Sequence, residues 1–182
     1  MKIGIIGGGI HGAAVAYFLT ELGDDDIHLF ERGQIADRSG STAYSAGIIR
    51  HHYSTEQHIR IVKWGSEFLK NFSEQVGSDP GYIQNGSLRL SQPKYEQTFK
   101  KIVALEQKVG IDVDFVPPNE LDTYLPAIDS TGVSIAALDK HGGFVDPHLV
   151  TTGFSDAARR NGAEIHTKTE VTDIDIAGRT VR

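Results

Sequence analysis

The first thirty residues alternate between two hydrophobic periods. Residues 2–6 form a short apolar run, residues 13–19 place apolar side chains at helical spacing, and residues 27–31 form a second short run. Short apolar runs favour strands, whereas a 3.6-residue period favours a helix. The pattern therefore predicts a strand over 2–6, a helix over 10–22 and a strand over 27–31, which together make a βαβ unit.

The alternation continues to the end of the chain. A helix is expected from residue 54 to about 76, with Trp64 in its apolar stripe and therefore in the core. Asp146 and Pro147 have the residue types of an N-cap and a first helical position. Residues 177–182 look like a hairpin whose return strand is missing. The other expected elements are strands over 82–90, 113–116, 133–138, 164–166 and 171–176, and helices over 94–109, 118–125 and 147–160.

Glycines occupy three positions of the first strand–helix turn. Gly7, Gly9 and Gly12 have the spacing G-x-G-x-x-G, directly after one predicted strand and at the start of a predicted helix. In dinucleotide-binding folds the first glycine permits a sharp turn, the second lets the pyrophosphate approach, and the third lets the helix pack on the strand. The amides and dipole of the helix N-terminus also favour phosphate. The pattern predicts a cofactor site that includes Ile10 and His11.

Glu31 ends the second predicted strand, 19 residues after Gly12. An acid at this distance accepts hydrogen bonds from a ribose 2′-hydroxyl in dinucleotide-binding proteins. A glycine-rich turn in an unrelated α/β protein is the alternative. We predict an α/β fold, with a Rossmann-like FAD/NAD(P)-binding domain over 1–79 and 141–182 and an inserted, partial α+β substrate-binding region over 80–140.

Composition narrows the class of protein. The chain has 182 residues, a net charge of −6 and no cysteine. The charge argues against nucleic-acid and anionic-membrane partners. The lack of cysteine excludes disulfides, thiolate catalysis and cysteinyl flavin within the chain. No apolar stretch or signal peptide points to a membrane, so we expect a cytoplasmic protein. We expect no metal site, and interpret the acidic triplet at 24–26 as a solvated turn.

Four passages carry a family resemblance. They are the glycine loop at 5–12, Glu31-Arg32, the Gly/Ser-rich loop at 40–50, and the re-entering segments at 142–149, 162–165 and 169–171. Together they resemble the FAD-dependent amine and amino-acid oxidases of the D-amino acid oxidase superfamily, particularly the branch of sarcosine oxidase, glycine oxidase and dimethylglycine dehydrogenase. The resemblance covers the whole chain. It favours FAD over NAD. Independently of the resemblance, a long loop and an inserted region follow the second strand, where a simple NAD-binding domain would continue with regular βα units.

The resemblance implies further cofactor contacts along FAD. Ser41 and Thr42 would lie near the pyrophosphate. Ala46, Gly47 and Ile48 would lie near the flavin ring, and Arg32 and Val171 near the adenosine. Turn-forming, surface or sheet roles are the alternatives for Ser41, Thr42, Arg32 and Val171. Tyr44 stands where some relatives carry a histidine that attaches FAD covalently, so we expect non-covalent FAD.

Arg50 and His51 are the candidate substrate-binding residues. The stretch 48–53 is similar to a part of sarcosine oxidases in which an arginine near the flavin helps to bind the substrate carboxylate. A guanidinium can donate two parallel hydrogen bonds to a carboxylate. A structural ion pair for Arg50, and structural or loop-lining roles for His51 and His52, are the alternatives. The sequence assigns no catalytic residue.

The resemblance implies an enzyme that oxidises a C–N bond of a small amino acid or N-methyl amino acid by hydride transfer to flavin N5. Members of the family are longer, so we expect an N-terminal portion that is inactive alone, with a possible partner chain that supplies the rest. Two alternatives remain: a non-catalytic FAD- or nucleotide-binding subunit that needs a partner chain and, with less support, an NAD-dependent dehydrogenase. The substrate and the electron acceptor stay open.

Overall fold

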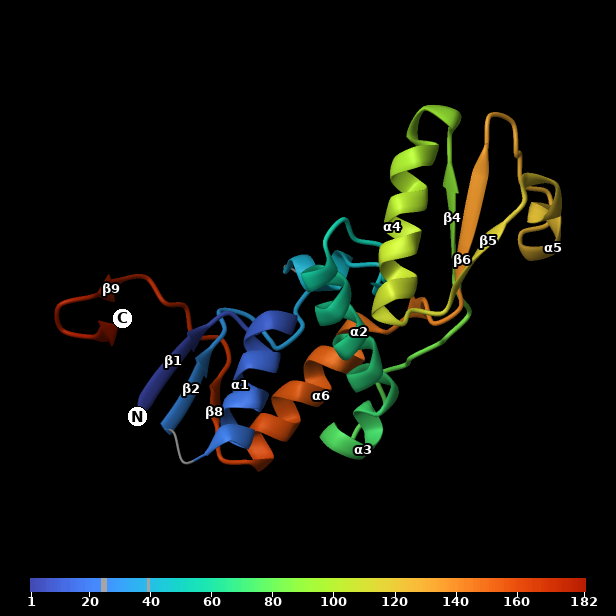
Figure 1. The fold of residues 1–182 in the computed structure, drawn as a ribbon. Coiled ribbons are helices and arrows are strands. Elements are labelled where there is room, and N and C mark those ends of the chain that lie inside the picture. Colours follow the sequence, from blue (N-terminus) through green and yellow to red (C-terminus); the bar gives the residue numbers. More distant parts are fainter. Residues whose placement is uncertain (24–25, 39) are drawn as a thin grey trace. The chain divides into compact units, whose positions relative to one another are not determined.

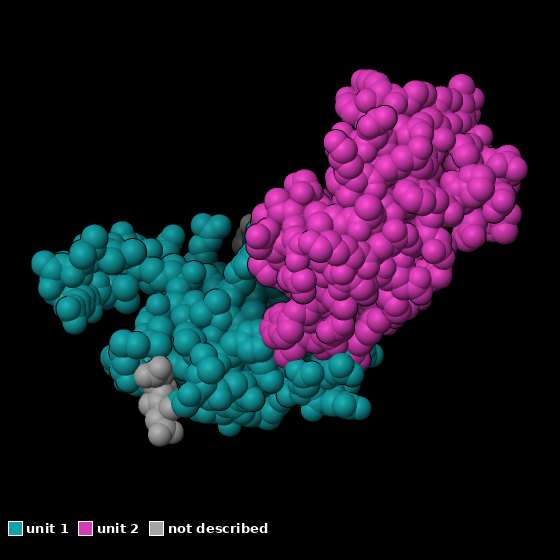
Figure 2. Space-filling model, viewed as in Figure 1, with its two compact units in different colours: residues 1–47, 71–81, 145–182 teal, residues 48–70, 82–144 magenta. Residues whose placement is uncertain are grey.

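The computed structural model describes residues 1–23, 26–38 and 40–182. Within it the chain forms two compact units, coloured separately in Figure 2. Unit 1 comprises Met1–Gly47, Asn71–Gly81 and Val145–Arg182, and unit 2 comprises Ile48–Lys70 and Tyr82–Phe144. Asp24 and Asp25, expected in a solvated turn, lie outside the described residues.

Unit 1 is built on a three-stranded parallel sheet with the strand order β1-β2-β8. The strands are β1 (Lys2–Ile6), β2 (Asp26–Phe30) and β8 (Glu164–His166). The helices α1 (Ile10–Leu22) and α6 (Pro147–Arg160) pack against each other and against this sheet (Figure 1). This confirms the predicted βαβ unit, and it confirms that the chain returns to the first sheet after the inserted region.

The core of unit 1 lies between the sheet and the two helices. Ile27 and Leu29 of β2 are buried, whereas the alternate residues of the strand are not. Ala13 and Ala16 of α1 are small and fully buried, and α1 packs against α6. Phe154 of α6 lies against the rings of Tyr17 and Phe18 of α1. The alternation of buried and unburied residues along β2 gives the strand one face toward the helices and one face free of them.

Three short elements complete unit 1. A 3₁₀ helix, η1 (Ser41–Tyr44), lies at the start of the Gly/Ser-rich loop at 40–50, and α3 (Phe72–Val76) packs on α6. At the end of the chain β9 (Ile174–Asp175) pairs antiparallel with β10 (Thr180–Val181). The expectation of a missing return strand is therefore wrong, because a short return strand closes this hairpin.

Unit 2 combines a second sheet with helices on both of its faces. The sheet has three antiparallel strands in the order β4-β6-β5. A separate two-stranded antiparallel ladder pairs β3 (Ile48–Ile49) with β7 (Gly143–Phe144). Its other elements, in chain order, are α2 (Glu56–Lys70), β4 (Ser87–Ser91), η2 (Pro93–Tyr95), α4 (Glu96–Val109), β5 (Val113–Val116), η3 (Pro118–Glu120), α5 (Leu121–Tyr124) and β6 (Ile135–Asp139).

The two faces of β6 meet two separate hydrophobic clusters. Ala137 belongs to a cluster with Ile59 of α2 and with Val103 of α4. Its neighbour Ala136 points to the other face and packs with Val116 and Leu121. Since successive residues of a strand point to opposite faces, the central strand carries small side chains on both. Unit 2 is thus an α+β region, as predicted for the insertion.

The boundary between the units differs from the one that the sequence suggested. Residues 48–70 were expected in the nucleotide-binding domain, but they group with the inserted region. The reason is that α2 packs against α4 and contributes Ile59 to their shared cluster. Trp64 is also placed differently, since its side chain is 57% exposed and stacks on Phe68 at the surface of α2. The expected core role for Trp64 is wrong.

Candidate functional site

The turn between β1 and α1 requires glycine at its first and last motif positions. Gly7 has a φ of +104°, which L side chains rarely adopt, and its N–H donates to the Phe30 carbonyl at 2.8 Å. A Cβ at Gly12 would overlap the carbonyl oxygen of Gly7. Only a residue without a side chain lets the helix lie this close to the strand. The sharp turn and the close packing agree with the roles predicted for Gly7 and Gly12.

The N-terminus of α1 carries no acidic residue and no bulky side chain at its N-cap. Gly9 is the N-cap, and a Cβ there would lie 2.9 Å from the Thr42 hydroxyl. The Ile10 N–H donates to that same hydroxyl at 3.1 Å, so η1 is held against the helix end. Since no first-turn acid opposes it, the positive end of the helix dipole favours an anion here.

Glu31 lies at the carboxyl end of the parallel sheet, directly after β2. One carboxylate oxygen accepts from the Gly8 N–H at 2.6 Å and the other accepts from the Gly33 N–H at 2.7 Å. Its backbone joins the 166–169 segment, donating to the His166 carbonyl and accepting from Thr169 N–H, each at 2.8 Å. An ionised carboxylate has about four lone-pair sites, so Glu31 retains capacity to accept a ribose hydroxyl.

These elements enclose a small cavity of about 130 Å³. It is lined by Gly8, Gly9, Glu31, Arg32, Ala36, Asp37, Gly40 and Thr42. A second hollow of about 550 Å³ shares Ala36 and Asp37 with it, so the two hollows adjoin. The residues fit an adenine dinucleotide in three respects: a helix end for phosphate, a carboxylate for ribose, and a glycine backbone without side chains between them.

The cavity brings together only part of the predicted cofactor site. Gly9, Glu31, Arg32 and Thr42 line it, whereas Gly7, Ile10, His11 and Gly12 form the loop and first helical turn beside it. Sequence reasoning missed four lining residues: Gly8, Ala36, Asp37 and Gly40. Gly8 lies inside the motif, and its place there is the signal that points to it. Ala36 adopts a φ of +56°, which no local sequence signal indicates.

The Gly/Ser-rich loop at 40–50 has mixed exposure. Ser41 and Ala46 are exposed, whereas Gly47 is buried with a φ of +62°. The Gly47 carbonyl accepts from the Val145 N–H at 3.0 Å, and a Cβ at Gly47 would overlap the Val145 carbonyl oxygen. This contact joins the loop to the segment before α6. Val171 is half-buried in unit 1, and Ile48 lies in β3 of unit 2, 63% exposed.

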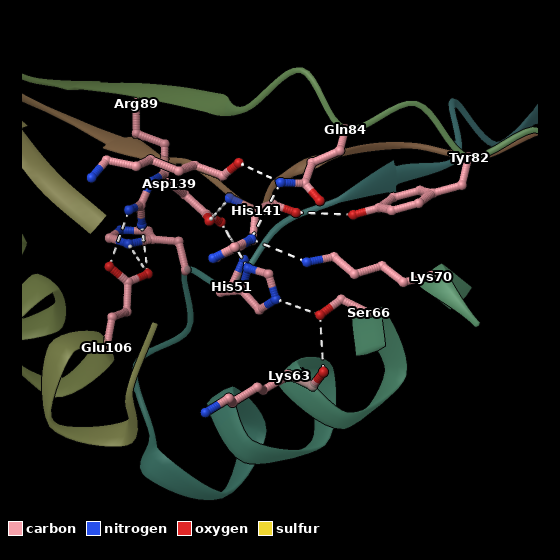
Figure 3. Close-up of polar contacts among 12 residues, drawn as sticks. His51, Lys63, Ser66, Lys70, Tyr82, Gln84, Arg89, Glu106, Asp139 and His141 are labelled. Atoms are coloured by element: carbon pink, nitrogen blue, oxygen red, sulfur yellow. Dashed lines mark hydrogen bonds and ion pairs between the residues drawn. The ribbon is translucent and has the colours of Figure 1, made fainter. Parts of the chain in front are cut away.

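Arg50 and His51 follow β3 in unit 2 and differ sharply in exposure. Arg50 is exposed, with its guanidinium carbon 5.9 Å from the centre of the Tyr53 ring. His51 is 1% exposed. Figure 3 shows its ring between two buried partners: Nδ1 lies 2.8 Å from the Asp139 carboxylate and Nε2 lies 2.8 Å from the Ser66 hydroxyl. This placement favours the structural alternative for the His51 side chain over a substrate contact.

Ser66, His51 and Asp139 resemble the order of a Ser-His-Asp triad, yet the proton direction is wrong for a nucleophile. The Ser66 hydroxyl donates to the Lys63 carbonyl at 2.9 Å. His51 Nε2 is then a donor toward Ser66, whereas a histidine base would accept the serine proton. All three side chains are buried, so we interpret them as a structural network.

A second buried ionic cluster lies beside the first in unit 2. Glu106 accepts two hydrogen bonds from Arg89, at 2.7 and 3.0 Å, and one ring nitrogen of His52 lies 3.1 Å from the same carboxylate. Burial raises the pKa of Glu106, and the guanidinium of Arg89 offsets only part of that effect. The half-exposed His52 ring is therefore held by a buried acid, which is a loop-lining role.

Comparison with known proteins identifies relatives over almost the whole chain. The chain is 30% identical to the mitochondrial pyruvate dehydrogenase phosphatase regulatory subunit of Mus musculus over 93% of its length, and 25% identical to human mitochondrial sarcosine dehydrogenase over 94%. L-proline dehydrogenase from P. horikoshii superposes on 99% of the chain with a TM-score of 0.87 and 30% identity.

The chain spans only part of each relative. It covers 19% of the two curated proteins and 47% of the solved dehydrogenase. Among the described residues, none of the helices has both the length and the apolar character needed to cross a bilayer. The model of the FAD dependent oxidoreductase (DAO) family matches residues 2–182, so the chain belongs to this family of flavoproteins.

Proposed function

We propose that unit 1 holds FAD non-covalently at the glycine loop, and that the chain serves the oxidation of a C–N bond in a small amino acid or N-methyl amino acid. The observation that carries the proposal is the α1 N-terminus beside a cavity lined by Gly9, Glu31 and Thr42. The names of the relatives, a sarcosine dehydrogenase and an L-proline dehydrogenase, support amino acids as the substrate class.

In this proposal each predicted cofactor-binding residue has one task. The helix end and the Thr42 hydroxyl bind the pyrophosphate, and Glu31 accepts the ribose hydroxyls. Ala46, Gly47 and Ile48 pass beside the ring, and Val171 pairs its backbone with the adenine. Tyr44 is 81% exposed on η1, and a phenol at this position supports a non-covalent cofactor.

Bound FAD would supply the redox chemistry by taking up a hydride from the substrate carbon at flavin N5, and water would hydrolyse the resulting imine. The task of this chain is to bind and orient the substrate. The guanidinium of Arg50 can bind a carboxylate through two parallel hydrogen bonds. Its exposure and its place after β3 support that role.

A non-catalytic FAD-binding subunit is the second candidate. It is favoured by one observation: the relative with 30% identity is named a regulatory subunit rather than an oxidase or dehydrogenase. Such a chain would hold FAD through the same residues of unit 1, and would need a partner chain for any oxidation.

Flavin binding is the first test. The purified protein is mixed with FAD, desalted, and its absorption spectrum is recorded. We expect retained flavin bands, and a Glu31→Gln variant with about 10- to 100-fold weaker FAD affinity because a charged hydrogen-bond acceptor is lost. Glu74→Gln, at an exposed site of α3, is the matched control and should bind normally. Retention of NAD but not FAD would overturn the cofactor assignment.

Substrate reduction separates the two candidates. The FAD-loaded protein is mixed without oxygen with sarcosine, glycine or L-proline, and the flavin absorption is followed. Bleaching by one of them supports the oxidase or dehydrogenase function. Bound FAD that none of them bleaches would favour the subunit, and addition of a partner chain that restores bleaching would establish it.

A further inference from the structure

The face of the unit 1 sheet that points away from α1 carries a cluster of metal-ligating side chains. In the parallel register of β2 and β8, His28 is opposite Glu164 and Phe30 is opposite His166. Ile27 and Leu29 point to the helices and are buried. The alternation of side chains along a strand therefore places His28, Glu164 and His166 together on the other face.

Three atoms of this cluster converge. His28 Nδ1 lies 3.1 Å from His166 Nε2, and both nitrogens lie 3.5 Å from the same Glu164 carboxylate oxygen. In a tetrahedral zinc site with bonds of about 2.0–2.1 Å, ligand atoms are about 3.3–3.4 Å apart. An ion at that bond length from all three atoms would lie just outside their plane, as tetrahedral coordination requires.

We propose that His28, His166 and Glu164 form a site for a divalent transition-metal ion of the Zn²⁺ class. Two imidazoles and one carboxylate are a donor set that suits Zn²⁺ and similar ions of intermediate softness. Three protein ligands leave the fourth position to water or another small ligand. No part of the FAD site is used, since Glu31 lies beyond the end of β2.

Asp26 strengthens the site from outside the ligand shell. Its carboxylate lies 2.7 Å from His28 Nε2, so this nitrogen carries the proton and Nδ1 is left as a lone-pair donor. Metal-ligating histidines are commonly oriented by a carboxylate in this way. His28 Nδ1 and His166 Nε2 face each other directly across nearly parallel rings. Binding therefore requires that the His166 proton move from Nε2 to the other ring nitrogen and that the two rings turn until both lone pairs point at the ion.

The surroundings of the cluster suit a bound cation. His28, Phe30 and His166 stack side by side with nearly parallel rings, which holds both imidazoles in place. They line a cavity of about 740 Å³, toward which the fourth position can open. Two cations, Lys2 and Arg179, line it as well, and Lys2 is paired with Asp26 at 3.6 Å. Glu164 within the cluster, and Asp26 outside it, supply the negative charge beside the ion.

The test is a calorimetric titration of the untagged, metal-free protein with Zn²⁺ alone. We expect one ion per chain, and an affinity at least about tenfold weaker for His166→Gln. Asp26→Asn should weaken binding by about 10- to 100-fold, the range observed for such outer partners. His148→Gln, which removes an exposed histidine of α6, is the matched control and should bind like the parent.

A spectrum of the Co²⁺-loaded protein adds a readout of geometry. Tetrahedral Co²⁺ absorbs visible light far more strongly than six-coordinate Co²⁺, so a strong band that disappears in His166→Gln supports the site. The proposal is overturned if the parent protein takes up no stoichiometric ion, if His166→Gln and Asp26→Asn, both folded by circular dichroism, bind as well as the parent, or if bound Co²⁺ is six-coordinate.

Discussion

Asp139 holds both the backbone and the side chain of His51. One carboxylate oxygen of Asp139 accepts from the His51 backbone N–H at 3.2 Å and lies 2.8 Å from its ring Nδ1. The other oxygen accepts from the His141 N–H at 3.1 Å. These contacts join the end of β6 to the segment after β3, and Ser66 extends them to α2 (Figure 3). The network fixes the chain next to Arg50.

Asp139→Asn should therefore destabilise the protein strongly. The substitution removes the charge that faces His51 inside unit 2, and breaking a buried pair costs about 3–5 kcal/mol of unfolding free energy. Urea denaturation measures this loss. Asp114→Asn, which removes an exposed partner of Lys140 in the same unit, is the control and should leave the free energy of unfolding nearly unchanged. Equal losses in both variants would contradict the structural role of the pair.

The contribution of Asp139 should also depend on pH. Burial alone would raise the pKa of Asp139, but the hydrogen bonds and the charge of His51 outweigh it and hold the pKa below its ordinary value. A lowered carboxyl pKa stabilises the fold above the unfolded value of about 3.9, and this stabilisation is lost as the pH falls through the lowered pKa. The stability difference between parent and Asp139→Asn should thus shrink below about pH 4. A difference that grows on acidification would refute the assignment.

The sequence predicted well those helix ends that are set by neighbouring residues in the chain. Asp146 caps α6 by accepting from the His148 and Leu149 N–H groups, and Pro147 begins the helix, as expected from their residue types. Trp64 was misplaced because an apolar stripe does not reveal which side of a helix meets a neighbour. The buried side chains of α2 are instead Ile59, Ser66 and Phe68.

The residues of the candidate sites also differ in whether the sequence alone could predict them. Gly9, Glu31 and Thr42 could be predicted to belong to one site because their positions carry a family pattern, and the structure places all three around one cavity. The burial of His51 and the meeting of His28 with His166 depend on strand register between residues far apart in the chain. Neither a spacing nor a period in the sequence encodes that register.

Gly12→Ala should prevent normal packing of α1. The new methyl group would overlap the Gly7 carbonyl, and because backbone must move, the cost should be about 3 kcal/mol or more. Gly65→Ala in α2 is the control: its Cβ meets nothing within 4 Å, so the same change should stabilise by about 0.5–1 kcal/mol. Thermal unfolding of the two variants measures the contrast, and a Gly12→Ala protein as stable as the parent would rule out the close approach.

Arg50→Gln tests the proposed carboxylate contact. If Arg50 binds the substrate, the substrate concentration for half-maximal flavin reduction should rise about 10- to 100-fold, since a charge-assisted hydrogen bond is lost. Arg50→Lys should restore only part of it, because ammonium lacks the two-pronged geometry of guanidinium. Reduction by an amine without a carboxylate is the internal control and should be unaffected. A rise of the same size for both substrates would mean that Arg50 acts on the fold of its loop.

Glu106 and Arg89 offer a contrast between breaking a buried pair and replacing it. Glu106 is fully buried, so Glu106→Gln leaves the Arg89 guanidinium without its counter-charge and should cost about 3–5 kcal/mol. The double variant Arg89→Met/Glu106→Leu removes both charges and fills a similar volume, so it should recover most of that loss. Urea denaturation of Arg89→Met, Glu106→Leu and the double variant gives the coupling free energy. Additive losses in the double variant would show that the two side chains contribute independently, against the bidentate contact.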